Sequence, residues 1–142
     1  MVVEEIERVK VGSAPGELPV GGLISHVTAR CPGNSAEVLE RAREVLLSVL
    51  QGLSGTEEGA SVSDLIPRWF IDECASGAGG WTLQNWLHWF TDEDRQWFWW
   101  DVDVVSSEVL DISIVTEDWP VPVGSFEWML RASGATEVEF DF

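Results

Sequence analysis

The chain has 142 residues, of which 45% are apolar, and this is enough for one hydrophobic core in a single domain over residues 1–142. Its 25 acidic and 8 basic residues give a net charge of −17. Such a charge disfavours nucleic acid and anionic membranes as direct partners and favours basic proteins. Two cysteines are too few for a disulfide framework, and the acidic N-terminus lacks the features of a secretory signal. Because no apolar run reaches membrane-spanning length, the sequence predicts a soluble cytoplasmic protein.

The N-terminal third is predicted to contain a loose segment, a short element and a long helix. Residues 1–22 are expected to be loosely ordered, because four glycines and two prolines fall between positions 12 and 22. A short element with His26 in it follows over residues 23–29. Asn34 or Ser35 then caps a helix that runs to Leu53. The helix is predicted from apolar residues at helical spacing, namely Val38, Leu39, Ala42, Val45, Leu46, Val49, Leu50 and Leu53.

Two shorter helices are predicted next. The first begins at Ser63 or Asp64, carries Pro67 in its first turn and stops at the glycine-rich residues 76–80. Cys74 lies near the apolar side of this helix, which favours an inert buried thiol over a nucleophile paired with His88. In the second helix Thr82 is the expected N-cap, and Trp81 and Trp86 have the spacing of a hydrophobic staple.

Residues 97–105 are the centre of the sequence and are predicted to form a β-strand, because they are aromatic or β-branched and alternate with period two. One face, expected to be buried, carries Phe98, Trp100, Val102 and Val104. The other carries Trp97, Trp99, Asp101 and Asp103. A strand does not need this second mixture of flat aromatics and carboxylates in order to fold, so it is a candidate working surface. The alternative is that a helix covers the tryptophans and that the aspartates lie at the solvated edge of the covered area.

A second strand, over residues 109–116, is predicted to form a hairpin with the first. A three-residue loop at 106–108 keeps the apolar residues of both strands on one side, as register selection requires. Val104 then opposes Leu110, and Trp100 opposes Ile114. The same register places Asp103 directly opposite Asp111, an arrangement that destabilises a sheet by up to roughly 1 kcal/mol.

The last part of the chain is predicted to form a helix over residues 125–132, with Gly134 as its C′ residue, and a strand over 136–142. The strand alternates apolar and acidic residues, so Glu137, Glu139 and Asp141 could extend the carboxylate surface if it joins the hairpin. The fold class is therefore α+β. A three-helix N-terminal layer packs on a small, mainly antiparallel C-terminal sheet with the order β-β-α-β.

The working surface predicts a site for a basic protein partner. Arginine or lysine of the partner would pair with the carboxylates and lie against the indole faces. The predicted partner-binding residues are Trp97, Trp99, Asp101, Asp103 and Asp111, supported by Asp92, Glu93 and Asp94. The expected function is that of a small acidic inhibitor, such as an immunity protein or antitoxin, that occludes the site of a basic partner such as a nuclease toxin.

Three alternatives remain open. Asp101-x-Asp103 is a short match to carboxylate pairs that hold a divalent metal, but no phosphate loop or arranged histidine accompanies it. A tryptophan-lined pocket for a small molecule could involve Trp86, Trp89, Trp97 and His88. An adaptor subunit would instead carry an apolar tryptophan patch. No catalytic residue, metal or cofactor is assigned, and a non-enzymatic role is expected.

Overall fold

The computed structural model describes Val9 and residues 23–53, 65–76, 82–88, 90, 97–116 and 124–141. Its elements are β1 Leu23–Arg30, α2 Ser35–Leu53, α4 Arg68–Ala75, α5 Leu83–His88, β2 Trp97–Val104, β3 Val109–Thr116, α6 Gly124–Ser133 and β4 Glu137–Asp141. The predictions made for residues 1–8 and 10–22, Trp81, Trp89 and Asp92–Asp94 fall outside the described residues.

The four strands form one sheet in the order β2-β3-β1-β4, and every neighbouring pair is antiparallel. With α4 and α5 set aside, the element order is β-α-β-β-α-β, which is the ferredoxin-like or split βαβ arrangement. The predicted α+β class with an antiparallel sheet is confirmed. The predicted sheet was incomplete, because β1 lies in its middle and pairs with both β3 and β4.

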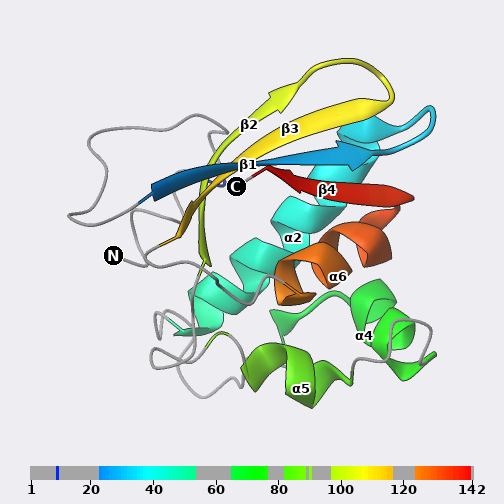
Figure 1. The fold of residues 1–142 in the computed structure, drawn as a ribbon. Coiled ribbons are helices and arrows are strands. Elements are labelled where there is room, and N and C mark those ends of the chain that lie inside the picture. Colours follow the sequence, from blue (N-terminus) through cyan, green and yellow to red (C-terminus); the bar gives the residue numbers. More distant parts are fainter. Residues whose placement is uncertain are drawn as a thin grey trace.

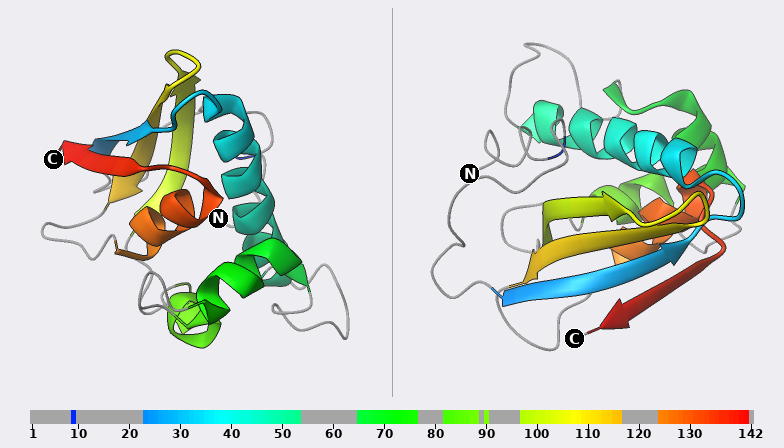
Figure 2. Two further views of the ribbon diagram at one scale, coloured as in Figure 1. Left: turned by 90° about the vertical axis from the view of Figure 1, so that its right-hand side faces the viewer. Right: turned by 90° about the horizontal axis from the view of Figure 1, so that it is seen from above.

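The helices and the sheet form separate layers. In Figure 1 and Figure 2 all the labelled helices lie on one side of the sheet, α2 and α6 nearest to it and α4 and α5 beyond them. The side chains of the sheet that point toward these helices are the buried ones, such as Val27, Ala29, Leu110, Ile112 and Ile114. No labelled helix covers the opposite face, which we call the outer face.

The long helix α2 follows its sequence pattern closely. All the predicted core residues whose burial the structure describes are buried, namely Val38, Leu39, Ala42, Val45, Leu46, Val49 and Leu50, and the side chain of Leu53 lies outside the described part. Glu37 and Arg41, one turn apart on its opposite side, form an ion pair of 2.6 Å. In α4 the prediction was less accurate: Pro67 has an extended ψ of 139° and is the N-cap of the helix, so it does not lie in the first turn.

A continuous line of aromatic rings connects the helical layers to the sheet. Ring centroids lie 4.6 to 5.5 Å apart along the series Phe70, Trp86, Phe90 and Trp97, and Phe126 of α6 is 4.7 Å from Trp97. Ser125 fixes two of these indoles. Its carbonyl oxygen accepts a hydrogen bond from Trp86 Nε1 at 2.9 Å, and its hydroxyl accepts one from Trp97 Nε1 at 3.0 Å.

Candidate functional site

A β-bulge in β2 changes which tryptophans face the core. The register with β3 shifts between Trp99 and Asp101, so Trp99 rather than Trp100 opposes Ile114. Trp97 and Trp99 therefore point toward the helices, and their side chains are 1% and 0% exposed. The prediction that these two indoles lie on an exposed surface was wrong. The physical reason is the one extra residue of the bulge. Before the bulge, the inward and outward positions of β2 are the reverse of those predicted, whereas from Asp101 onward they are as predicted.

The burial predicted for the other face of β2 is correct only in part. Trp100 is buried as predicted, whereas Phe98 and Val102 are only half-buried. Val104 was predicted to be buried but is 46% exposed. Its side chain is on the helix side of the sheet, opposite Leu110, but it lies near the tip of a strand at the edge of the described sheet.

The hairpin register beyond the bulge is confirmed. Val102 opposes Ile112, Val104 opposes Leu110, and Asp103 opposes Asp111. Asp101, Asp103 and Asp111 all project from the outer face. Because Asp103 and Asp111 face each other on adjacent strands, their like charges oppose folding by up to roughly 1 kcal/mol.

The outer face carries further acids from the other edge of the sheet. β4 pairs with β1 so that Glu139 opposes Thr28 and Glu137 opposes Arg30, and Thr28 in turn opposes Asp111. Glu137 and Glu139 are exposed. We call the set Asp101, Asp103, Asp111, Glu137 and Glu139 the acidic face.

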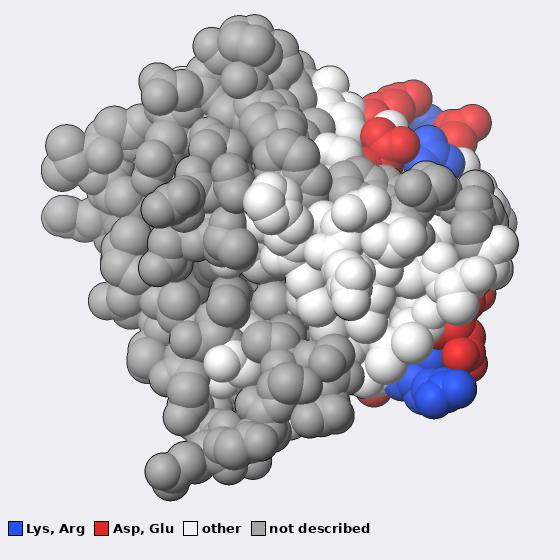
Figure 3. All heavy atoms as spheres, turned by 90° about the horizontal axis from the view of Figure 1, so that it is seen from below, with Lys and Arg blue, Asp and Glu red and all other residues white. Residues whose placement is uncertain are grey.

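The cations of the described chain do little to neutralise the acidic face. Four of the five described arginines pair with an acid of their own helix, in the ion pairs Arg41–Glu37, Arg43–Glu40, Arg68–Asp72 and Arg131–Glu127. In Figure 3, which views the molecule from below, the basic groups of the described residues lie beside acidic ones at one edge of the view. The excess negative charge of the described residues is therefore concentrated on the sheet.

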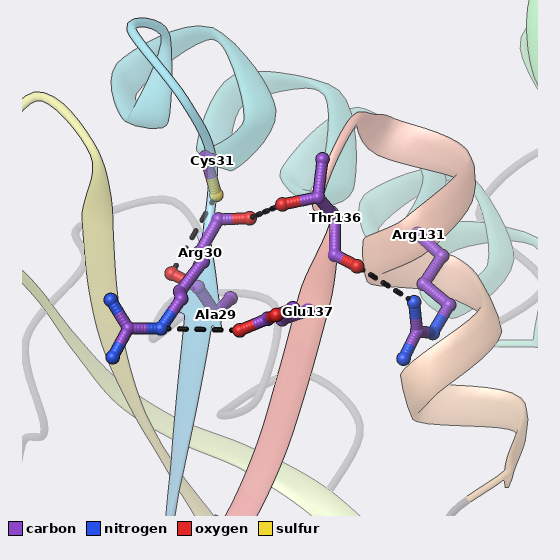
Figure 4. A network of polar contacts seen from close by, with 6 residues as sticks. All are labelled: Ala29, Arg30, Cys31, Arg131, Thr136 and Glu137. Carbon is purple, nitrogen blue, oxygen red and sulfur yellow. Dashed lines mark hydrogen bonds and ion pairs between the residues drawn. The ribbon is translucent and has the colours of Figure 1, made fainter.

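The fifth arginine, Arg30, is held at one end of the acidic face. Its Nε lies 3.3 Å from a Glu137 carboxylate oxygen, and its carbonyl oxygen accepts a hydrogen bond from the Thr136 N–H at 2.8 Å. Arg131 Nη1 donates to the Thr136 carbonyl oxygen at 3.0 Å, which ties the end of α6 to the start of β4 (Figure 4). Arg30 thus offsets Glu137, whereas no described arginine pairs with Asp101, Asp103, Asp111 or Glu139.

His26 is the only other basic group on this face among the described residues. Its Nδ1 lies 3.6 Å from Asp111 Oδ1 and 3.4 Å from the Ser113 hydroxyl. A catalytic triad needs the carboxylate and the hydroxyl on opposite ring nitrogens, but here both approach the same nitrogen. The arrangement therefore indicates a surface cluster that can exchange hydrogen bonds with a partner.

Asp101 has a structural role in addition to its charge. Its Oδ1 accepts a hydrogen bond from the Val102 backbone N–H at 2.8 Å, immediately after the bulge. The carboxylate thus satisfies a backbone donor beside the irregularity in the strand. For this reason Asp103 and Asp111 are the better residues for testing a partner interaction, since their substitution leaves the bulge intact.

The alternative sites receive no support from the described residues. Within them, no group of three or more histidine, cysteine or acidic side chains is placed to hold a metal ion. Trp86 and Trp97, expected in a ligand pocket, are part of the buried aromatic line, and His88 is exposed on α5. Asp92, Glu93 and Asp94 lie outside the described residues.

Both cysteines are buried free thiols. Burial raises the pKa of Cys31, and burial also raises the pKa of Cys74, where the Trp128 side chain opposes part of the rise. We expect neither thiol to react with a disulfide reagent faster than the protein opens, because the thiolate is the reactive form. Thiol labelling of the native protein and of the protein in denaturant checks this. Rapid labelling of Cys74 in the native protein would instead support the hypothesis that this thiol is a nucleophile.

No helix among the described residues combines the length and the apolar character that a membrane span requires. No family model matches the chain, and no curated protein or solved structure is similar to it.

Sequence reasoning missed the contribution of β1 to the site. The backbone of β1 lies between β3 and β4 and brings Glu137 and Glu139 onto the same face as Asp103 and Asp111. The sequence does carry a period-two pattern here, because Ser25, Val27 and Ala29 alternate with His26, Thr28 and Arg30. The structure buries the first three residues and leaves the other three exposed or half-buried. The small side chains of Ser25 and Ala29 weaken that pattern.

Proposed function

We propose that this protein is a protein-binding inhibitor that neutralises a basic partner, in the manner of an immunity protein or antitoxin acting on a nuclease. The observation that carries the proposal is the acidic face. Its opposed carboxylates Asp103 and Asp111 cost stability, face away from the core and have no described arginine beside them.

The chemistry of the acidic face favours a basic protein over nucleic acid. Four-stranded sheets that bind RNA do so through exposed aromatic rings that stack on bases, on a surface that tolerates phosphates. Here the corresponding area carries carboxylates, and β2 directs Trp97 and Trp99 inward. Carboxylates repel phosphates but pair with arginine and lysine, which nucleic-acid enzymes use to hold their substrates.

The mechanism that follows is occlusion. The carboxylates of the acidic face would occupy the positions that substrate phosphates take on the partner, so that the partner's cations are no longer available to the substrate. The charge of −17 would also accelerate the encounter with a basic partner, and this acceleration falls as the salt concentration rises.

Charge reversal on the acidic face tests this proposal. We expect the tagged protein to capture a basic protein from an extract of its source cells at low salt and to release it steeply as salt rises. The double variant Asp103→Lys/Asp111→Lys should weaken binding to that purified partner by about tenfold or more. The matched control Glu44→Lys/Glu73→Lys makes the same change in net charge at exposed positions of α2 and α4 and should retain most of the affinity.

A milder change separates a functional cost from a structural one. Asp103→Asn removes the repulsion with Asp111, so the free energy of unfolding should rise by up to roughly 1 kcal/mol while partner affinity falls. Denaturant unfolding and a binding titration measure the two effects. The proposal would be contradicted if the double variant and its matched control lost the same affinity. It would also be contradicted if the affinity for the partner did not change with salt concentration.

A further inference from the structure

We propose that the open edge of β2 around Val104 is a strand-addition site, at which an extended basic segment of the partner adds to the sheet by backbone pairing. The inference rests on the proposed function and specifies how the partner is held. β2 is the outermost strand of the described sheet on that side, so its far edge pairs with no other described strand.

The backbone groups of Val104 are directed to that open edge. In an antiparallel pair, residues alternate between those that bond their partner strand and those that do not. Val105 N–H donates to the Val109 carbonyl oxygen at 3.1 Å, so the neighbouring pair of Val104 and Leu110 is a non-bonded one. The other side of β3 agrees, because Cys31 N–H donates to the Glu108 carbonyl oxygen at 2.7 Å, which directs the backbone groups of Leu110 toward β1.

The part of the β2 edge that is available for pairing begins at the Val102 carbonyl. By the same alternation the Val102 N–H also points away from β3, but the Asp101 carboxylate already accepts its hydrogen. An incoming strand therefore finds the Val102 carbonyl and both backbone groups of Val104. Three backbone hydrogen bonds are available, and the bulge and its carboxylate prevent pairing from extending toward Trp99.

The side chains around this edge define the chemistry of the incoming segment. Val104 and Val105 are 46% and 59% exposed, on opposite faces of the sheet. A partner residue opposite Val104 points to the helix side and should be apolar and β-branched. Its two neighbours in the partner strand point to the outer face, where Asp103 lies, and should be arginine or lysine. The segment that fits is thus extended, with basic and β-branched residues in alternation.

The probe for the first test is a capped six-residue peptide of alternating arginine and valine, titrated into the full chain. We expect saturable binding and at least about tenfold slower hydrogen exchange of the Val104 amide. The same peptide with its valine backbone nitrogens methylated should bind at least about tenfold more weakly, because it cannot pair with the edge.

Two variants of Val104 separate the backbone from the side chain. Val104→Pro removes the N–H that points to the open edge and spares the hydrogen bonds between β2 and β3, since proline is tolerated on edge strands. It should lose peptide binding, whereas Val104→Thr keeps the N–H and should bind. Circular dichroism and thermal unfolding check the fold of Val104→Pro, and the methylated peptide tests the same bond in the unmutated chain.

Equal affinity for the plain and methylated peptides would overturn the strand-addition site, as would an unprotected Val104 amide or the absence of peptide binding. The proposed function can survive this failure. If Asp103→Lys/Asp111→Lys abolishes partner binding while folded Val104→Pro binds the partner normally, the partner docks on the acidic face without adding a strand.

Discussion

Replacing Trp97 by alanine is expected to lower the free energy of unfolding by about 3–5 kcal/mol. The side chain is 1% exposed, contacts Phe90 and Phe126 and donates its indole N–H to the Ser125 hydroxyl. The substitution removes all these contacts and leaves a cavity between β2 and α6. Since whole domains are stable by only about 5–15 kcal/mol, this loss is a large fraction of the total stability. Urea unfolding followed by far-ultraviolet circular dichroism measures the loss.

The matched control for this prediction is Trp69→Ala. Trp69 is half-buried at the far end of the aromatic line, with one edge-to-face contact to Phe70. Its loss should cost clearly less than the loss of Trp97. A change of less than about 1 kcal/mol for Trp97→Ala would mean that this indole lies at the surface, as the strict alternation of the sequence predicts.

Gly134→Ala is expected to be the second large effect, with a loss of about 2–3 kcal/mol. Gly134 has a φ of +124°, a backbone conformation that other residues adopt only under strain. A Cβ atom built there would lie 3.0 Å from Val38 Cγ2 in α2, so the side chain meets a packed neighbour as well. The residue ends α6 in a Schellman motif, in which Gly134 N–H bonds the Arg131 carbonyl and Ala135 N–H bonds the Leu130 carbonyl.

Gly33→Ala supplies the comparison, because Gly33 also has a positive φ, +74°, but nothing lies within 4 Å of the position of its Cβ. It should lose only about 1 kcal/mol, which isolates the strain from the steric contact. Thermal or denaturant unfolding of both variants measures the difference. If the two losses are equal, the contact with Val38 is relieved at no cost, and the close approach of α2 and α6 is not tightly packed.

Most of the secondary structure could be predicted because local signals agreed with the tertiary structure. In α2 the apolar spacing matches the buried face. The three-residue loop at 106–108 follows from the requirement that Val102 and Val104 share a face with Ile112 and Leu110. At α6, Gly134 is recognisable as the C′ residue from the sequence alone.

The bulge at Trp100 could not be predicted in the same way. Both faces of the sequence from Trp97 to Trp100 are aromatic, so hydrophobicity does not say which indoles point inward. The choice depends on the space between sheet and helices, where Phe90, Phe126 and Ser125 form contacts with Trp97. Ser125 and Phe126 are distant from Trp97 in sequence, and no local pattern contains them. The sequence placed Asp101, Asp103 and Asp111 on one face because the hairpin register beyond the bulge is set by the turn.

The central place of β1 also has consequences for how the chain acquires its structure. Arg30, in the last position of β1, bonds Thr136, which is 106 residues away in sequence. Contacts between such distant segments slow folding, because the entropy of closing a long loop is lost before the strand pairing contributes favourable free energy. During synthesis β1 emerges before β3 and β4, so both of its edges stay unpaired until those strands have been made. A chain that stops before Glu137 would leave one edge of β1 open, and we expect it to aggregate rather than form a smaller version of the fold.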